Sequence, residues 1–171
     1  AVGTFTVLNY EGAVQGGAAT NVVLGDFPPR AAMTLAENAG NTSIDLNVTD
    51  LGERIKWTGA TDALWDRDDT TNWVTEAGGV PTAYLQDLLV GDRVRFDDTA
   101  VGNFSVTVAD PVNPAELVVS NELNDYTISG DAIGGSAGLV KQGAATLILN
   151  SSATSESATL AQPGALPIAP A

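Results

Sequence analysis

Apolar and polar residues alternate one by one along much of this chain. In residues 43–50 the apolar positions are Ile44, Leu46 and Val48, and a polar residue stands on each side of every one of them. Successive side chains of a β-strand point to opposite faces, so this period predicts half-buried strands. The same alternation recurs in four other places, which are residues 55–57, 93–96, 103–110 and 126–128.

Further apolar runs rich in Val, Thr and Leu extend the pattern. They occupy residues 4–10, 20–27, 31–37, 116–121 and 145–150, and segments rich in Gly, Asn, Asp and Pro separate them. Strands on the order of ten, short and regularly spaced, are typical of all-β architectures. We therefore expect an all-β protein in which residues 1–150 form one domain.

Evidence for helix is confined to residues 81–92, PTAYLQDLLVGD. Leu85, Leu88 and Leu89 have helical spacing, and Pro81 suits the first turn of a helix. A short helix or 3₁₀ turn and an irregular loop are both compatible with this segment.

The last residues, 151–171, change in character and are rich in Ser, Ala and Pro. Such a composition is typical of a linker or an extended tail. Leu160, Leu166 and Ile168 are apolar, however, so the tail could instead lie along a groove or a sheet edge.

Charge and composition exclude several classes of function. The chain carries 21 acidic and 7 basic residues, a formal net charge of −14, which repels nucleic acid and anionic membranes. It contains no Cys and no His, which removes Ser-His-Asp and Cys-His catalysis and ordinary zinc, iron or copper sites. No apolar run reaches the roughly 20 residues of a membrane-spanning helix. The chain begins AVGTFTV, without Met or a signal-peptide pattern, so we expect a processed chain or an excerpt of a longer one.

Residues 135–150, GSAGLVKQGAATLILN, contain a recognisable motif. They resemble the autotransporter-associated β-strand repeat, also called the passenger-associated transport repeat, which has Gly, Leu, Lys, Gly, Gly, Leu and Leu at fixed spacing. Ala145 stands where that motif has its last Gly, so the turn there is expected to differ. The matching residues are Gly138, Leu139, Lys141, Gly143, Leu147 and Leu149.

Upstream elements that accompany this repeat in bacterial surface proteins are present in the same order. They are Trp57 with Gly59, Trp65 with Asp66, Asn72 with Trp73, the run Gly91, Asp92, Val94 and Phe96, and the run Tyr126, Ile128 and Gly130. Together the resemblance covers about residues 57–150. It implies a secreted or surface-exposed, right-handed parallel β-solenoid whose repeat helps translocation and stacking. A two-sheet β-sandwich is the alternative, because the same alternation fits both folds.

The stretch LWDRDDTTNW, residues 64–73, is the candidate metal site. Asp66, Asp68 and Asp69 offer carboxylate oxygens of the kind calcium prefers. The stretch lacks the Gly and the closing Glu of an EF-hand, and Arg67 offsets part of the charge. The other interpretation is a surface turn between two core anchors, Trp65 and Trp73.

Three other features bear on function. Asp97 and Asp98, with the aspartates of residues 66–69, could supply the paired carboxylates of a glycosidase, although no signature places two of them across a cleft. The three tryptophans, Trp57, Trp65 and Trp73, could stack on sugars or serve the core, and we expect at least Trp57 or Trp73 to be buried. Lys141 is expected to lie on an outer face with its ammonium group in water.

These observations favour a non-enzymatic structural protein, located outside the cell or on a bacterial surface. We expect a stalk, an adhesin shaft or a fibre subunit, with no cofactor unless calcium binds. A carbohydrate-binding surface module that takes a glycan is the second hypothesis, and a polysaccharide-active enzyme is the third. Because residues 4–10 begin as a strand without an obvious cap, we expect both ends of the sheets to be open and copies to associate head to tail.

Overall fold

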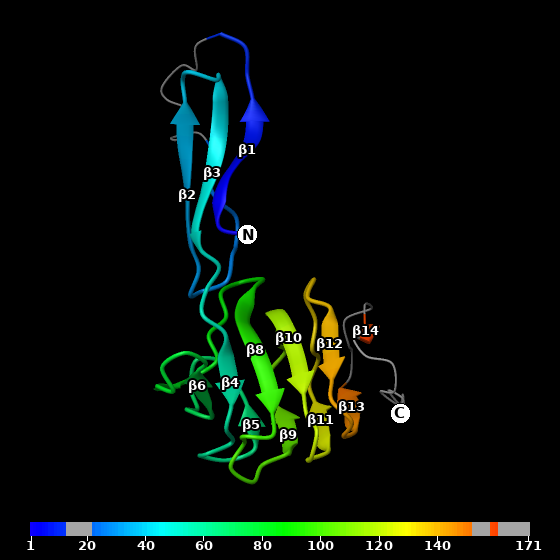
Figure 1. Cartoon of the computed structure of the whole chain (residues 1–171). Coiled ribbons are helices and arrows are strands. Elements are labelled where there is room, and N and C mark those ends of the chain that lie inside the picture. Colours follow the sequence, from blue (N-terminus) through cyan, green and yellow to red (C-terminus); the bar gives the residue numbers. More distant parts are fainter. Residues whose placement is uncertain (13–21, 152–157, 161–171) are drawn as a thin grey trace.

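The computed structural model describes residues 1–12 and 22–151 and the backbone of residues 158–160. The described residues contain strands and no helix, so the expected all-β class is confirmed. The strands of the described residues form three sheets, and none of these sheets is closed (Figure 1).

The first sheet, called the N-terminal sheet, is antiparallel and has the order β1-β3-β2. It projects away from the rest of the molecule in Figure 1. Its strands pair antiparallel, which departs from the parallel stacking expected for the whole of residues 1–150. The strands are β1 (Gly3–Asn9), β2 (Ala32–Asn38) and β3 (Ser43–Asp50).

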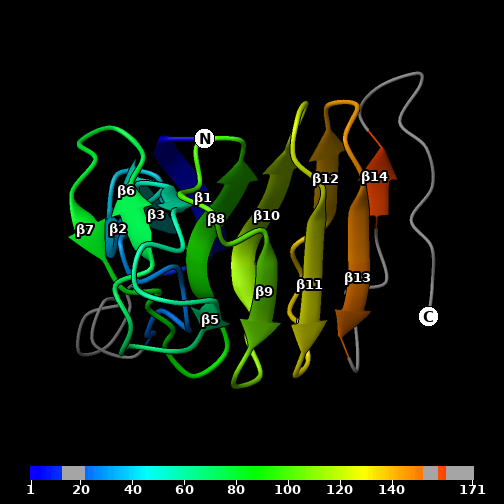
Figure 2. The same ribbon diagram turned by 90° about the horizontal axis from the view of Figure 1, so that it is seen from below.

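The other two sheets lie face to face and are built mainly from parallel strands (Figure 2). The long sheet has the order β14-β12-β10-β8-β4-β6-β7, and the short sheet has the order β13-β11-β9-β5. The long-sheet strands are β4 (Ile55–Trp57), β6 (Trp73–Thr75), β7 (Pro81–Thr82), β8 (Gly91–Asp97), β10 (Pro114–Ser120), β12 (Leu139–Gln142) and β14 (Ala158–Leu160). The short-sheet strands are β5 (Leu64–Trp65), β9 (Ser105–Val108), β11 (Tyr126–Gly130) and β13 (Leu147–Ser151).

The chain alternates between these two sheets as it advances. Four pairs of strands, each with one strand in either sheet, define four units: unit 1 (β4 and β5), unit 2 (β8 and β9), unit 3 (β10 and β11) and unit 4 (β12 and β13). Equivalent residues of successive units pair in parallel register. One such row crosses the long sheet through Ile55, Val94, Leu117, Leu139 and Ala158.

The core fills the space between the two sheets and follows the alternation of the sequence. In β8, Val94 and Phe96 are fully buried, whereas the alternating Arg93 and Arg95 reach the outer face. Val106 and Val108 of β9 are buried in the same alternating way. The period-two pattern therefore predicted the inward residues of these strands correctly.

One segment differs from expectation, another takes one of the two forms that the sequence left open, and a third is only partly described. Residues 81–92 contain no helix and form β7, a loop and the first two residues of β8, which agrees with the loop alternative; Leu88 and Leu89 are 89% and 68% exposed. Leucines with helical spacing need an apolar surface to pack on, and here none covers them. Residues 22–27 form no strand. In the tail, residues 158–160 add β14 to the edge of β12, whereas Leu166 and Ile168 lie outside the described residues.

Candidate functional site: a capped end, a charged face and an open end

An aromatic cluster fills the core at the unit 1 end of the two sheets. Trp57 and Trp65 are 0% exposed and Trp73 is 1% exposed, which confirms the predicted burial of Trp57 and Trp73. The Trp57 and Trp73 rings meet edge to face, with centroids 5.1 Å apart, and Tyr84 and Phe96 complete the cluster. Because all three indole rings are buried, they offer no face on which a sugar could stack.

Strands β6 and β7 cover this end of the core. β6 pairs antiparallel with β4, and β7 pairs antiparallel with β6, so the two strands break the parallel series beside unit 1. The outermost strand carries Pro81, whose nitrogen has no hydrogen to donate to a further strand. The expectation that both ends are open is therefore wrong for this end.

Buried Asn72, which directly precedes β6, holds residues 61–64 in place. The sequence did not predict this role. The Nδ2 of Asn72 donates to Asp62 Oδ1 at 2.6 Å and to the Leu64 carbonyl at 2.8 Å. Its Oδ1 accepts the backbone N–H groups of Thr61 and Asp62, both at 3.0 Å. The side chain thus satisfies four groups with its full hydrogen-bonding capacity.

The predicted metal candidates lie on the turn between Trp65 and Trp73. Asp66 is half-buried and accepts hydrogen bonds from the backbone and the hydroxyl of Thr70, whereas Asp68 and Asp69 are exposed. Asp68 has a φ of 60°, a conformation that Asp tolerates in turns. Nowhere in residues 1–12 and 22–151 do three or more acidic side chains gather closely enough to hold a metal ion. Calcium binding by Asp66, Asp68 and Asp69 stays a hypothesis without a geometric site behind it.

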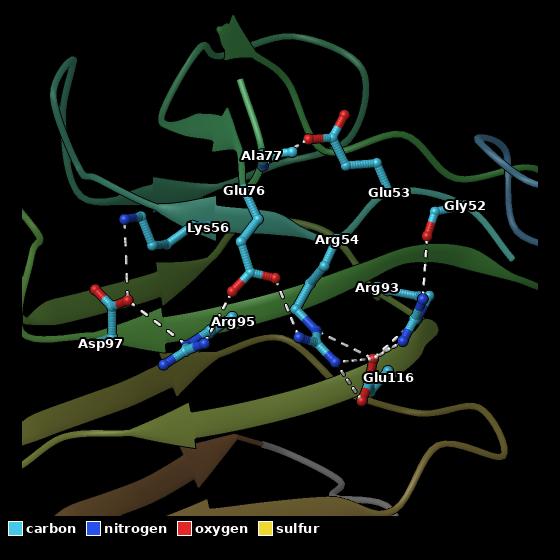
Figure 3. Close-up of polar contacts among 10 residues, drawn as sticks. All are labelled: Gly52, Glu53, Arg54, Lys56, Glu76, Ala77, Arg93, Arg95, Asp97 and Glu116. Atoms are coloured by element: carbon cyan, nitrogen blue, oxygen red, sulfur yellow. Dashed lines mark hydrogen bonds and ion pairs between the residues drawn. The ribbon is translucent and has the colours of Figure 1, made fainter. Parts of the chain in front are cut away.

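A network of ion pairs covers the outer face of the long sheet (Figure 3). Arg54 reaches Glu76 at 3.1 Å and Glu116 at 2.8 Å, and Arg93 reaches Glu116 at 2.8 Å. Arg95 reaches Glu76 at 2.8 Å. Lys56 and Arg95 also approach Asp97, at 4.0 and 3.6 Å.

This network ties neighbouring units together across the sheet. Four of the seven basic residues of the chain take part in it, and Arg54 beside β4 bonds Glu116 on β10 across the intervening β8. Each pair is partly exposed and contributes about 0–1 kcal/mol alone. Parallel sheets usually have both faces covered by helices, and here paired charges form a solvated outer face instead. Asp97 belongs to this network, where its carboxylate faces Lys56 and Arg95.

Carboxylates at one corner of units 2 and 3 accept backbone N–H groups from the next unit. Asp98 of unit 2 accepts from Glu122, Leu123 and Asn124 of unit 3, at 2.7 to 3.1 Å. Partial burial acts to raise the pKa of Asp98, but these hydrogen bonds outweigh it and hold the pKa below its ordinary value. Asp125 of unit 3 accepts from Thr146 of unit 4 at 2.6 Å. Asp98 is thus a structural acceptor between units.

Lys141 is buried, which corrects the expectation of a solvated ammonium group. It is 4% exposed and lies in the inward row with Phe96 and Val119. Its Nζ donates to the carbonyls of Gln142 and Gly143, both at 2.8 Å. Burial lowers the pKa of Lys141, and nearby Glu122 and other carboxylates act in the opposite direction. The motif lysine therefore secures the turn that follows its own strand.

An ion pair between half-buried Arg30 and buried Asp92 joins the N-terminal sheet to the units. Arg30 lies 3.0 Å from Asp92, which is 1% exposed, and it also donates to the Thr82 hydroxyl at 2.8 Å. Burial raises the pKa of Asp92, while the Leu85 N–H and Arg30 act to lower it. Arg93 donates to the Gly52 carbonyl at 3.1 Å. These contacts orient the N-terminal sheet on the units.

The opposite end of the sheets is open in the described part of the chain. In the long sheet β14 extends one strand beyond β12, whereas β13 is the last strand of the short sheet. Leu147 of β13 is buried, and Ile148 is 36% exposed on the other face. Within the described residues, no strand pairs with the outer edge of β13 over residues 147–150, so one more parallel strand could pair there.

Comparisons with known proteins give no relative. No family model, no curated protein and no solved structure matches this chain. Within the described residues there is also no helix with the length and apolar character needed to cross a bilayer.

Proposed function

We propose that this chain is a structural segment of an extracellular, right-handed parallel β-solenoid, and that it forms the capped beginning of a stalk, adhesin shaft or fibre subunit. The observation that carries this proposal is the parallel, in-register pairing of equivalent strands across the units. In the short sheet the register runs from Leu64 through Thr107 and Ser129 to Asn150. Stacks of this kind add strands along one axis and make elongated shafts.

The unequal ends of the sheets support growth in one direction. At the unit 1 end, β6 and β7 cover the aromatic cluster, and Pro81 stands on the outermost strand. At the unit 4 end, β13 is the last strand of the short sheet within the described residues, and Leu139 and Leu147 contribute aliphatic side chains to the core. In the head-to-tail model, therefore, further strands add only at the end formed by β13 and β14. They come from further coils of the same chain or from an identical neighbour.

An added coil tests this proposal. Leu139 pairs with Ala158, so a copy of residues 139–157 inserted after residue 157 places the copied strand where β14 now lies. We expect the variant to fold, and its maximum dimension in small-angle X-ray scattering to grow by about 4.8 Å, the spacing of stacked strands. Hydrogen-exchange measurements should show that the amides of the inserted strands are protected.

The control carries an insert of the same composition in shuffled order. The shuffled insert should stay unprotected against exchange, because it lacks the inward apolar positions that match the row of Leu117 and Leu139. If the copied coil is as unprotected as the shuffled one, the end is not built for continuation and the solenoid proposal is wrong.

A further inference from the structure

Strand β1 is an exposed edge with an unusual apolar content. All seven of its residues are exposed, and Phe5, Val7 and Leu8 are 42%, 52% and 49% exposed. In the described structure β1 pairs with β3 on one side, and its other side is the margin of the N-terminal sheet (Figure 1). A strand with these properties offers a template to another extended strand.

The usual protections of an edge strand are nearly absent from β1. Residues 1–10 contain no charged residue and no proline, whereas the whole chain carries a net charge of −14. A β-bulge between Thr6 and Leu8 interrupts the regular pairing and leaves Gly3–Thr6 as the regular stretch. Like charges directly opposite one another destabilise a strand pair, so this uncharged edge is where two copies of an acidic protein can approach closely.

We propose that two copies of this chain associate through their β1 strands, which pair antiparallel about a two-fold axis near Phe5. In this arrangement Phe5 lies opposite Phe5 of the second copy, and Thr4 lies opposite Thr6. The two N-terminal sheets then form one continuous six-stranded sheet. Aromatic pairs and Thr pairs are both favourable cross-strand contacts, so the register is self-complementary.

The side chains of β1 are already held in position for this pairing. Thr4 Oγ1 donates to Asn47 at 2.8 Å and Thr6 Oγ1 donates to Asp45 at 2.9 Å, both on β3. Pre-ordered groups lose less conformational entropy when they bind. The surface lies on a different sheet from the open edge of β13, so the inference is independent of the proposed function.

Sedimentation velocity of two variants of the full chain tests the proposal. Thr4 and Thr34 occupy the same cross-strand row through Asn47, and both are exposed, but they lie on opposite edges of the sheet. We expect the unmodified chain to be a dimer, the Thr4→Lys variant to be a monomer, and the Thr34→Lys variant to remain a dimer. Circular dichroism establishes that both variants keep their fold.

A second pair of variants reports the register and does not depend on a charge. The chain has no Cys, so Phe5→Cys should form a disulfide-linked dimer on mild oxidation, whereas Leu35→Cys, in the same row on the other edge, should not. A monomeric unmodified chain at high concentration overturns the proposal. So does equal loss of the dimer in both Lys variants, or equal crosslinking of both Cys variants.

Discussion

Replacing Trp73 with alanine lowers the free energy of unfolding by about 3–5 kcal/mol, the range found for large aromatic residues in cores. Trp73 is 1% exposed, and its ring centroid lies 5.4 Å from Trp65 and 5.3 Å from Phe96. It lies on β6, so its loss leaves a cavity between the covering strand and the first parallel unit. The measurement is the free energy of unfolding in urea for both proteins.

Leu88→Ala is the control for this substitution. Leu88 is 89% exposed and lies in the loop between β7 and β8, so its truncation should change the free energy of unfolding by less than about 0.5 kcal/mol. An equal, small effect of the two substitutions would show that the aromatic cluster does not close this end of the core.

Replacing Gly143 with alanine is expected to lower the free energy of unfolding by about 2–4 kcal/mol, because two penalties combine there. Gly143 has a φ of +83°, in the left-handed region that disfavours a side chain. A Cβ at this position would also meet the backbone oxygen of Asn121, in the preceding unit, at 2.1 Å. Unit 4 would have to move away from unit 3 to accept it.

Gly79→Ala separates the two penalties. Gly79 has a φ of +63°, and a Cβ built there has nothing within 4 Å. The free energy of unfolding of this control variant should fall only by the penalty of the left-handed backbone conformation, about 1–2 kcal/mol. If thermal and urea unfolding give the same loss for both alanine variants, the close approach between units 3 and 4 is not present in solution.

Local patterns predicted the strands well, since period-two alternation reports directly which side chains point inward. Val94, Phe96, Val106 and Ile128 are buried as that pattern requires. The pattern does not report the partner of a strand, because inward and outward positions alternate equally in parallel and antiparallel pairs. For this reason the antiparallel N-terminal sheet and the antiparallel strands β6 and β7 could not be separated from the parallel units.

The buried polar residues were harder to predict from the sequence than the strands. Lys141 and Asn72 are buried because backbone carbonyls and N–H groups of turns surround them, and such partners come from loop geometry rather than from a residue pattern. One signal was available for Lys141. It occupies the inward phase of its strand, two residues after buried Leu139, and this phase indicated burial despite the charge.

Oxidative crosslinking of paired cysteines tests the central claim, the parallel register of successive units. Ser129 on β11 pairs with Asn150 on β13, so the variant with Cys at both positions should form an intramolecular disulfide rapidly and keep its fold. The matched variant has Cys at positions 127 and 150. Thr127 pairs with Ile148, so these two cysteines lie two positions out of register, beyond the roughly 7 Å that a disulfide can span. Fast crosslinking of the first variant and slow crosslinking of the second is the predicted result, and equal rates, or a preference for the offset pair, would contradict the stacked parallel architecture.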